Sequence, residues 1–416
     1  MVGIGGIGMS ALAQLLRHTG HDVSGSDREE SPIMTMLVQK GIHVVVGHDQ
    51  CNIPVDCTLL IYSDAVPSSN VERVRAQELR IPEMSYFEAL GEVSKKARTI
   101  AVAGTHGKTT VTGMLAKILQ FAKKEPTAIV GSIVQDFGSN FLAGRNDFFV
   151  VEACEYRDHL LKLAPEILVI TNLELDHTDY FPNLEALQKT FRKAVEKVPQ
   201  SGAIVANPYD PIVAAVLGDA KAPIIDYTTQ SVPRLELIGE FNRMNARAAK
   251  AAARAIYSDI SLYAVDEALR SFKGSWRRFE YRGETPNGAV VYDDYAHHPT
   301  AVAKTIEAAR ERFPNKRIVV AFHPHLHSRT ERFLQEFADA LDLADRAIVA
   351  PIYEARTEVV HAVSNHTVAE ASLRGSIEAM DSFDEIRDAL LQEDGNSLII
   401  TMGAGDIYKV AEQIAD

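Results

Sequence analysis

Residues 99–111 read Thr99-Ile-Ala-Val-Ala-Gly104-Thr-His-Gly107-Lys108-Thr109-Thr110-Val111. An apolar run ends here in a glycine loop, and an amphipathic stretch follows it at residues 111–122. A strand, a Gly-Lys-Thr loop and a helix in this order are typical of a phosphate loop, whose backbone N–H groups cradle phosphate oxygens. In such a loop Lys108 neutralises the phosphate and the Thr109 hydroxyl can reach Mg²⁺. The strict pattern has a glycine where this chain has Val102, so we interpret the loop as a variant.

Strand-like runs alternate with amphipathic stretches along most of the chain. We expect strands at residues 42–46, 58–62, 99–103, 148–152, 167–171, 203–206, 290–293, 317–322, 346–350 and 397–402. Helical patterns lie between most of them, for example at residues 184–198 and 300–313. This alternation favours an α/β fold with helices on both faces of mainly parallel sheets.

Two changes in composition divide the chain into three predicted α/β domains. The 416 residues are too many for one ordinary core. A polar segment at residues 91–98 precedes the strand of the phosphate loop, and a helical stretch ends in Phe-Lys-Gly-Ser-Trp just before residue 277. We therefore expect domains at residues 1–97, 98–276 and 277–416.

The composition argues against several functional classes. The net charge is −13 and no long basic run occurs, so nucleic-acid binding is not expected. No apolar run approaches the roughly 20 residues of a membrane helix, and no signal peptide is recognisable. Only three cysteines occur, without a CxxC pair, so neither a disulfide framework nor a zinc site is expected. We expect a cytoplasmic protein without membrane insertion.

A further glycine loop opens the chain as Gly3-Ile-Gly5-Gly6-Ile-Gly8 and is followed by Met9-Ser10. The G-x-G-x-x-G spacing at a helix start is typical of dinucleotide binding, and Asp27 stands where an acidic ribose contact belongs. A tight strand–helix turn without a ligand is the alternative. Few residues precede the loop, so the strand before it is either very short or clipped.

A third loop reads Gly403-Ala-Gly405-Asp-Ile407 and follows the strand expected at residues 397–402. It has neither the lysine of the second loop nor the full glycine spacing of the first. By itself, this pattern favours an ordinary strand–helix turn over a ligand site.

Several more motifs occur in order across the three predicted domains. They are Glu152-Ala-Cys-Glu155-Tyr, Thr171-Asn172-Leu-Glu-Leu-Asp176-His177, Gly239-Glu-Phe-Asn242-Arg-Met-Asn245, Arg277-Arg278-Phe-Glu280, Asp293-Asp294-Tyr295-Ala-His297-His298-Pro299 and His323-Pro-His325-Leu-His-Ser-Arg329-Thr330. Together with the phosphate loop at residues 104–110, they resemble the motifs of the Mur ligase family. The resemblance runs nearly end to end.

The resemblance implies a fold and an activity. It implies a Rossmann-like N-terminal domain for a UDP sugar, a central ATPase domain, and a Rossmann-like C-terminal domain that brings the amino acid. The implied enzyme uses ATP and Mg²⁺ to phosphorylate a carboxylate, which an amine then attacks, in peptidoglycan precursor synthesis. The implied substrates are UDP-N-acetylmuramate, L-alanine and ATP, and the implied state is a monomer or homodimer. The first loop would then hold the UDP diphosphate instead of NAD.

The resemblance also implies roles for individual residues. The implied catalytic residues are Lys108, Glu152, His177 and Arg278, and the implied Mg²⁺ ligands are Thr109, Glu152 and His177. The implied ATP contacts are Gly104, Thr105, His106, Gly107, Lys108, Thr109, Thr110, Asn242, Asn245 and Asp294. The implied UDP-sugar contacts are Gly5, Gly6, Gly8, Ser10, Asp27 and Ser63. The implied amino-acid contacts are Tyr295, His297, His325 and Arg329.

Residue chemistry supports some of these roles more than others. Arg329 suits a carboxylate because its guanidinium can form two parallel hydrogen bonds. Asn242 and Asn245 are three residues apart at the start of a helix expected at residues 246–256, so both face one side. Mg²⁺ prefers oxygen ligands, so the role of His177 rests on the resemblance alone.

Three positions depart from the family pattern. Phe191 lies near the place where several Mur ligases carry a carbamylated lysine, which the members that add L-alanine lack. Phe241 replaces the usual histidine of the G-x-H-N motif and removes its nucleotide contact. Only a short polar stretch, residues 227–237, precedes Gly239 where most relatives have a longer hairpin, so we expect a trimmed central domain with an exposed sheet edge.

Four alternatives remain open at this point. A ligase that recycles a tripeptide onto UDP-N-acetylmuramate should end in a pattern like G-F-G-G-I-H. A folylpolyglutamate synthase should lack the first domain. A NAD-dependent dehydrogenase would explain the first glycine loop but would give the Gly-Lys-Thr loop no function. A non-catalytic UDP-sugar-binding protein would be expected to lose Lys108 or Glu152, and both are present.

Overall fold

The computed structural model describes residues 1–145, 147–354 and 362–415. The chain forms two compact units, here called the first unit (Met1–Glu174, Leu184–Leu235, Met244–Lys273) and the second unit (Leu175–Asn183, Glu236–Arg243, Gly274–Asp416). The predicted domains 1–97 and 98–276 lie mainly in the first unit, and the predicted domain 277–416 lies in the second. Three segments expected in the central domain, residues 175–183, 236–243 and 274–276, belong instead to the second unit, and the three-domain boundaries remain a prediction.

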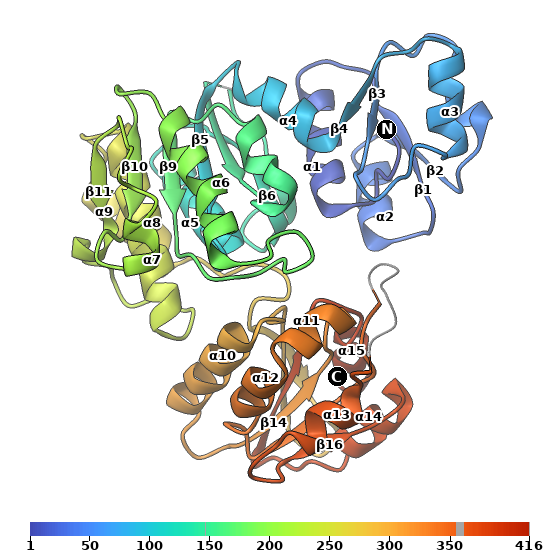
Figure 1. Ribbon diagram of the computed structural model, residues 1–416, viewed down its shortest axis with the longest axis vertical. Coiled ribbons are helices and arrows are strands. Elements are labelled where there is room, and N and C mark those ends of the chain that lie inside the picture. The colour runs from blue at the N-terminus through green and yellow to red at the C-terminus, as the bar shows by residue number, and fades with distance from the viewer. Residues whose placement is uncertain (146, 355–361, 416) are drawn as a thin grey trace. The chain divides into compact units, whose positions relative to one another are not determined.

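The N-terminal part of the first unit is a small parallel sheet with helices (Figure 1). Its elements are α1 (Ile7–His18), β1 (Ser24–Asp27), α2 (Pro32–Gln39), β2 (His43–Val46), η1 (Gln50–Asn52), β3 (Leu60–Tyr62), α3 (Val71–Glu78), β4 (Glu83–Ser85) and α4 (Tyr86–Ser94). β1 pairs with β2, and β3 pairs with β4. Val2 bridges Ser26 on one side and Tyr62 on the other, and so joins the two pairs. The strand expected before the first loop is reduced to this bridge.

The rest of the first unit is built on a seven-stranded sheet in the order β11-β10-β9-β5-β8-β6-β7. Its strands are β5 (Arg98–Ala103), β6 (Thr127–Val134), β7 (Ser139–Leu142), β8 (Phe148–Glu152), β9 (Ile167–Ile170), β10 (Ala203–Ala206) and β11 (Ile224–Asp226). Its helices are α5 (Lys108–Phe121), η2 (Tyr156–Lys162), α6 (Leu184–Lys197), α7 (Pro211–Ala214), η3 (Tyr227–Thr229), α8 (Glu240–Ile256), which begins in the second unit, and α9 (Leu262–Arg270). All pairings are parallel except that of β6 with β7. The short strand β11 forms one edge.

The second unit is built on a six-stranded sheet in the order β12-β13-β17-β14-β15-β16. Its strands are β12 (Glu280–Glu284), β13 (Val290–Asp294), β14 (Arg317–Phe322), β15 (Arg346–Val349), β16 (Ile377–Ala379) and β17 (Ser397–Met402). Its helices are α10 (Pro299–Arg312), α11 (His327–Arg332), α12 (Leu334–Leu341), α13 (Asn365–Glu370), α14 (Phe383–Leu390) and α15 (Tyr408–Ile414). Only β12 pairs antiparallel.

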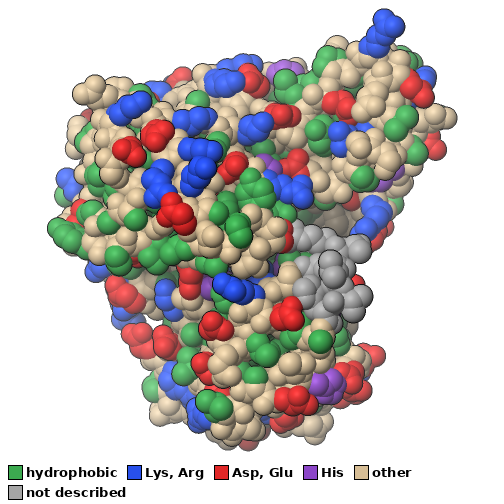
Figure 2. All heavy atoms as spheres, viewed as in Figure 1, with side chains coloured by type: hydrophobic (Ala, Val, Ile, Leu, Met, Phe, Trp, Pro, Cys, Tyr) green, Lys and Arg blue, Asp and Glu red, His purple; other side chains and the backbone are tan. Residues whose placement is uncertain are grey.

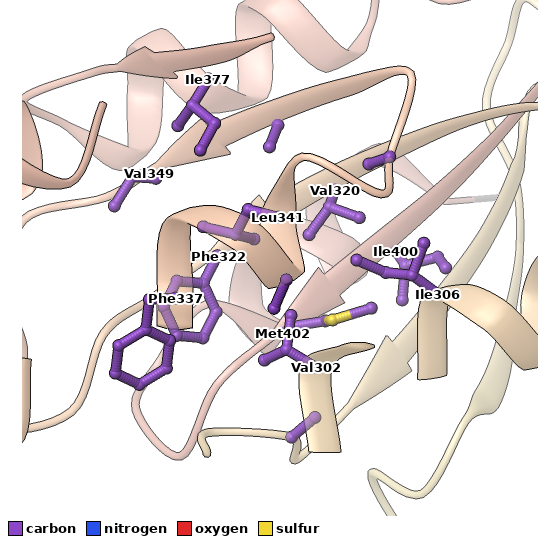
Figure 3. Packing of buried hydrophobic residues seen from close by; sticks show 14 of the residues in the cluster. Val302, Ile306, Val320, Phe322, Phe337, Leu341, Val349, Ile377, Ile400 and Met402 are labelled. Carbon is purple, nitrogen blue, oxygen red and sulfur yellow. The ribbon is translucent and has the colours of Figure 1, made fainter. Parts of the chain in front are cut away.

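Both faces of this sheet are apolar. In strand β14, alternate side chains lie in the two core clusters that cover the two faces. Val320 and Phe322 point into one core cluster, which includes Phe337 of α12 (Figure 3). Val319 and Ala321 point into a second cluster on the opposite face. Successive side chains of a strand point to opposite faces, so a strand covered by helices on both sides is apolar throughout.

The α/β fold class with mainly parallel sheets is confirmed, and all ten predicted strands are present. The sequence reading missed β1, β4, β6, β7, β11, β12 and β16. Most of these are short or lie near a sheet edge, where apolar patterning is weak. β6 is long, but Gly131 and Ser132 interrupt its apolar pattern. Helix α8 begins at Glu240, six residues before the predicted start, because Gly239 at φ +84° ends the preceding segment.

No helix in the described residues is long and apolar enough to cross a membrane. On the face drawn in Figure 2, basic and acidic side chains are interspersed. This distribution agrees with the absence of a long basic run in the sequence.

Candidate active site

The loop between β5 and α5 requires both of its glycines. Gly104 has φ +126° and Gly107 has φ +83°, in the region that side chains disfavour. A Cβ at Gly104 would lie 2.1 Å from the Thr171 hydroxyl, and one at Gly107 would lie 2.3 Å from the Asn245 amide oxygen. Helix α5 begins directly at Lys108, so its free N–H groups face the loop. The backbone therefore has the form of a phosphate cradle.

Lys108 is held at this loop by a buried carboxylate. Its ammonium donates to the backbone oxygens of Gly104 and Thr105 at 2.6 and 3.2 Å and to Glu155 at 3.0 Å. Burial lowers the pKa of Lys108, but the charges of nearby carboxylates, chiefly Glu155, outweigh it and hold the pKa above its ordinary value. The ammonium therefore keeps its positive charge at neutral pH. Glu155 lies in the acidic motif at residues 152–156, whose pattern predicted no role for it.

Thr109 and Glu152 are brought together from α5 and the end of β8. The Thr109 hydroxyl donates to Glu152 Oε1 at 3.1 Å, and the Gly131 N–H donates to Oε2 at 2.8 Å. Gly131 is needed here because a Cβ would lie 2.4 Å from the carboxylate. A hydroxyl oxygen and a carboxylate side by side are ligands that suit Mg²⁺. The third predicted ligand, His177, belongs to the second unit, where its N–H donates to Asp176 at 2.6 Å.

The segment after β9 braces the phosphate loop through side chains that the sequence reading did not place in the site. Asn172 accepts from the His106 N–H and donates to its carbonyl, both at 3.0 Å. The Thr105 hydroxyl exchanges hydrogen bonds with the backbone of Glu174 at 2.9 Å. The His106 ring lies 2.9 Å from the Glu174 carboxylate. Among the remaining predicted loop contacts, Thr110 is buried in α5.

Asp27 at the end of β1 caps the first glycine loop. Its carboxylate accepts the Gly5 N–H at 2.8 Å and the Arg28 N–H at 2.7 Å. Helix α1 begins at Ile7, and its N-cap Gly6, which is exposed, provides no side-chain cap. The helix start is therefore open to an anion. One carboxylate oxygen is already engaged with the loop.

Ser10 and Ser63, both predicted to contact the UDP sugar, pack against other parts of the protein. Ser10 is fully buried, and its hydroxyl donates to the Ile7 carbonyl and accepts from Asn140 of β7 at 2.9 Å. In this conformation it ties α1 to the central sheet instead of facing solvent. Ser63 lies under the loop, where a Cβ at Gly3 would come within 2.9 Å of its own Cβ.

The four predicted amino-acid contacts lie together in the second unit. Arg329 is 4% exposed, pairs with the Asp176 carboxylate, and approaches His325 Nδ1 at 3.1 Å. The His297 ring lies 6.0 Å from that of His325 and 5.1 Å from that of Tyr295. The guanidinium that was predicted to receive a carboxylate thus already has an internal one.

Charges in this cluster control its protonation. Burial raises the pKa of Asp176, but Arg329 and the neighbouring histidines outweigh it and hold the pKa well below its usual range. Burial and the Arg329 charge lower the pKa of His297 well below its usual range, so its imidazole is neutral. The His297 ring therefore adds no positive charge to the cluster.

Asp294, predicted to contact ribose, binds the backbone around it. Its two oxygens accept the Phe279 N–H at 2.8 Å and the Ala296 N–H at 2.7 Å. Burial raises its pKa to about 6. Arg278, the predicted phosphate contact, lies 5.0 Å from the centroid of the Tyr295 ring.

The third glycine loop is filled by Arg277. This side chain is 3% exposed and donates to the carbonyls of Gly403 and Gly405 at 2.6 and 2.9 Å. Its Nε pairs with Asp293 at 2.7 Å. The loop is a strand–helix turn between β17 and α15, as its pattern favoured, and Arg277, for which the sequence predicted no role, makes it a structural joint.

Asn242 and Asn245 both lie on α8 and are buried. The Asn242 amide donates to the Ile238 carbonyl at 2.8 Å. Asn245 belongs to the first unit and lies against Gly107 of the phosphate loop. Phe241 packs on Gly239, where a Cβ would lie 2.6 Å from its ring. The structure therefore brings Asn245 to the phosphate loop.

A cavity of about 970 Å³ lies elsewhere in the first unit. Residues of α1, β1, β3 and α4 line it, together with Phe149. None of the predicted site residues is among the residues that line it. Cavity size is thus a poor guide to the chemistry of this chain.

Sequence comparisons cover all three regions of the chain. Residues 1–98 match the Mur ligase family catalytic domain, residues 102–236 the Mur ligase middle domain, and residues 277–405 the glutamate ligase domain of Mur ligases. A UDP-N-acetylmuramate–L-alanine ligase of Caldicellulosiruptor saccharolyticus is 36% identical, covering 100% of this chain and 98% of that protein. One of Desulfitobacterium hafniense is 37% identical, covering 99% and 98%.

Solved structures agree with these matches. The UDP-N-acetylmuramate–alanine ligase of Thermotoga maritima has a TM-score of 0.81 at 28% identity, covering 99% of this chain and 97% of that one. A murein peptide ligase of Psychrobacter arcticus shares the fold with a TM-score of 0.74 at 24% identity, covering 100% and 98%. Near-complete coverage at such identity leaves one assignment: the chain belongs to the Mur ligase family.

Proposed function

We propose that this chain uses ATP to join L-alanine to the carboxylate of UDP-N-acetylmuramate, a step of peptidoglycan precursor synthesis. The full-length relatives named UDP-N-acetylmuramate–L-alanine ligase support the substrates. One structural observation carries the chemistry. The phosphate loop meets the acidic motif after β8, with Lys108 at 3.0 Å from Glu155 and Thr109 at 3.1 Å from Glu152.

The loop residues suit the first half of such a reaction. A carboxylate is a poor electrophile, so the sugar carboxylate attacks the γ-phosphorus of ATP and forms an acyl phosphate, with ADP as the leaving group. Phosphoryl transfer needs charge neutralisation and in-line positioning. Lys108 and the N–H groups at the start of α5 neutralise the phosphate charge. The hydrogen bonds of Asn172 and Thr105 hold the loop in place. Thr109 and Glu152 would hold Mg²⁺, which would neutralise phosphate oxygens when bound, and His177 stays a proposed third ligand.

The second unit suits the second half. The amine of the amino acid attacks the acyl carbon, and phosphate leaves from the tetrahedral intermediate. Arg329 has the guanidinium geometry for the amino-acid carboxylate, and the neutral His297 lies in the same cluster. Arg278 and Asp294 are proposed to contact ATP from this unit, and Asn245 from α8. The first loop, with Gly5, Gly6, Gly8 and Asp27, is proposed to hold the UDP moiety.

One assay tests this proposal. Phosphate release is measured with ATP and UDP-N-acetylmuramate across L-alanine, glycine, L-serine and the cell-wall tripeptide. We expect the highest kcat/KM with L-alanine. Preference for the tripeptide would assign the chain to the recycling ligases, and no release with any amine would contradict ligation.

A further inference from the structure

The side chain of Tyr86 lies against the first glycine loop. Tyr86 is the first residue of α4, and a Cβ added to Gly8 would come within 2.7 Å of its Cζ and 2.8 Å of its Oη. Gly8 lies in the first turn of α1, next to the open N-cap at Gly6. The phenol hydroxyl therefore stands beside the backbone N–H groups that face the proposed diphosphate.

The Tyr86 hydroxyl is a half-buried donor that no described residue uses. Within residues 1–145, 147–354 and 362–415, it forms no hydrogen bond. Burial, with smaller contributions from the charges of Glu152 and Cys154, raises the pKa of Tyr86 well above its usual range, so the phenol keeps its proton. A polar group of this kind that lacks a partner in the protein is a candidate ligand contact.

The surroundings hold the ring in place. Phe87 packs edge-on against Tyr86 with ring centroids 4.7 Å apart, and it also stacks on His159 with ring centroids 3.6 Å apart. His159 Nε2 lies 2.8 Å from the Asp64 carboxylate. Ser85 and Glu88 form a capping box at the start of α4. A side chain fixed in this way loses little conformational entropy when a ligand binds.

We propose that the Tyr86 hydroxyl donates a hydrogen bond to a diphosphate oxygen of the bound UDP sugar. This inference rests on the proposed function. The first loop offers mainly backbone N–H groups, and Asp27 occupies that of Gly5. A neutral phenol adds a donor to the diphosphate site directly over the first turn of α1. It recognises the anion without the positive charge that the phosphoryl-transfer loop uses.

The test is the Tyr86→Phe variant, which removes the hydroxyl and keeps the ring that packs on Gly8 and Phe87. Hydrogen bonds to charged groups stabilise by about 1.5–3 kcal/mol, or roughly 10- to 100-fold in affinity. We expect KM for UDP-N-acetylmuramate to rise at least about 10-fold, with KM for ATP and L-alanine within about twofold of wild type. Calorimetry with UDP alone should show a similar loss of affinity, since UDP carries the diphosphate and lacks the sugar.

The matched control is Tyr209→Phe, which removes the hydroxyl of an 80% exposed tyrosine in the same unit and should change nothing. Equal melting temperatures for wild type and Tyr86→Phe would exclude a folding defect. Unchanged UDP affinity in Tyr86→Phe would overturn the inference, even if the complete sugar nucleotide bound less tightly. Failure of the wild type to bind UDP-N-acetylmuramate would instead contradict the proposed function, and this is measured first.

Discussion

Two glycine loops of this chain each follow a buried strand, and each holds a buried cation, but in different ways. In the loop at residues 104–110 the cation is Lys108 of the loop itself, and its side chain is 15% exposed. In the loop at residues 403–405 the cation is Arg277, which comes from a distant segment and is 3% exposed. Both have a carboxylate partner, Glu155 and Asp293 respectively.

The difference lies in what each cation connects. Lys108 bonds to its own loop and to Glu155, through a flexible stem whose ammonium can turn toward an arriving phosphate. The planar guanidinium of Arg277 joins β13 to two carbonyls of the third loop in fixed directions. The phosphate loop thus carries its own cation on a flexible stem, whereas the cation at the third loop comes from a distant segment and ties that loop to β13.

The largest effect should come from Lys108→Ala. A cation at a transferring phosphoryl group contributes about 10³- to 10⁵-fold in rate, so ligation should fall on the order of 10⁴-fold. UDP-sugar binding should survive, because Lys108 serves ATP. Steady-state kinetics and calorimetry check this, and ligation within tenfold of wild type would contradict the role of the second loop.

Arg277→Ala should act on stability. Removing one partner of a buried ion pair leaves Asp293 unpaired and costs about 3–5 kcal/mol of unfolding free energy. Trp276, the only tryptophan, packs on Tyr408 beside this joint and reports unfolding by fluorescence in urea. Arg277→Lys keeps the charge and should lose less. If Arg277→Ala were as stable as wild type, the third loop would not be a joint.

The unfolding free energy should depend on pH through Asp294, which follows Asp293, the ion-pair partner of Arg277. Its folded pKa of about 6 exceeds the ordinary 3.8, so the folded state binds the proton more tightly. The unfolding free energy should therefore fall as pH rises from about 4 to about 6, by up to roughly 3 kcal/mol from this group. Asp176 acts with the opposite sign, since its pKa is lowered and its contribution is lost on acidification.

Urea unfolding across this pH window compares wild type with Asp294→Asn, which cannot ionise. In the variant, the unfolding free energy should not show the fall that Asp294 causes between about pH 4 and about pH 6, whatever the absolute stability of the variant. Identical pH profiles would show that Asp294 is not the responsible group.

The smallest effect should come from the ion pair of Arg329 with Asp176. This pair is buried, like that of Arg277 with Asp293, but it lies in the proposed amino-acid site. Asp176→Asn removes the charge that orients the guanidinium, so KM for L-alanine should rise about tenfold with kcat less affected. Glu185→Gln, at an exposed carboxylate paired with Arg192, is the control. A lower KM would mean that Asp176 competes with the substrate carboxylate and does not orient Arg329.

Much of the fold and part of the site were predictable from local pattern. The ten predicted strands follow from apolar runs bounded by turn residues, and the phosphate loop follows from the spacing of Gly107, Lys108 and Thr109. The early start of α8 and the strand β6 were missed because glycines at positions 239 and 131 obscure the pattern. Contacts with ligands at the predicted site residues remain predictions.

The sequence by itself determined the fold class, the position of the phosphate loop and the motif order, because each depends on residues close together in the chain. Only the tertiary structure decided which side chains are engaged. Ser10 meets Asn140 across 130 positions, and Arg277 reaches Gly405 across 128. Spacing specifies a local turn or helix, whereas the burial and partners of a polar group depend on segments that folding brings together.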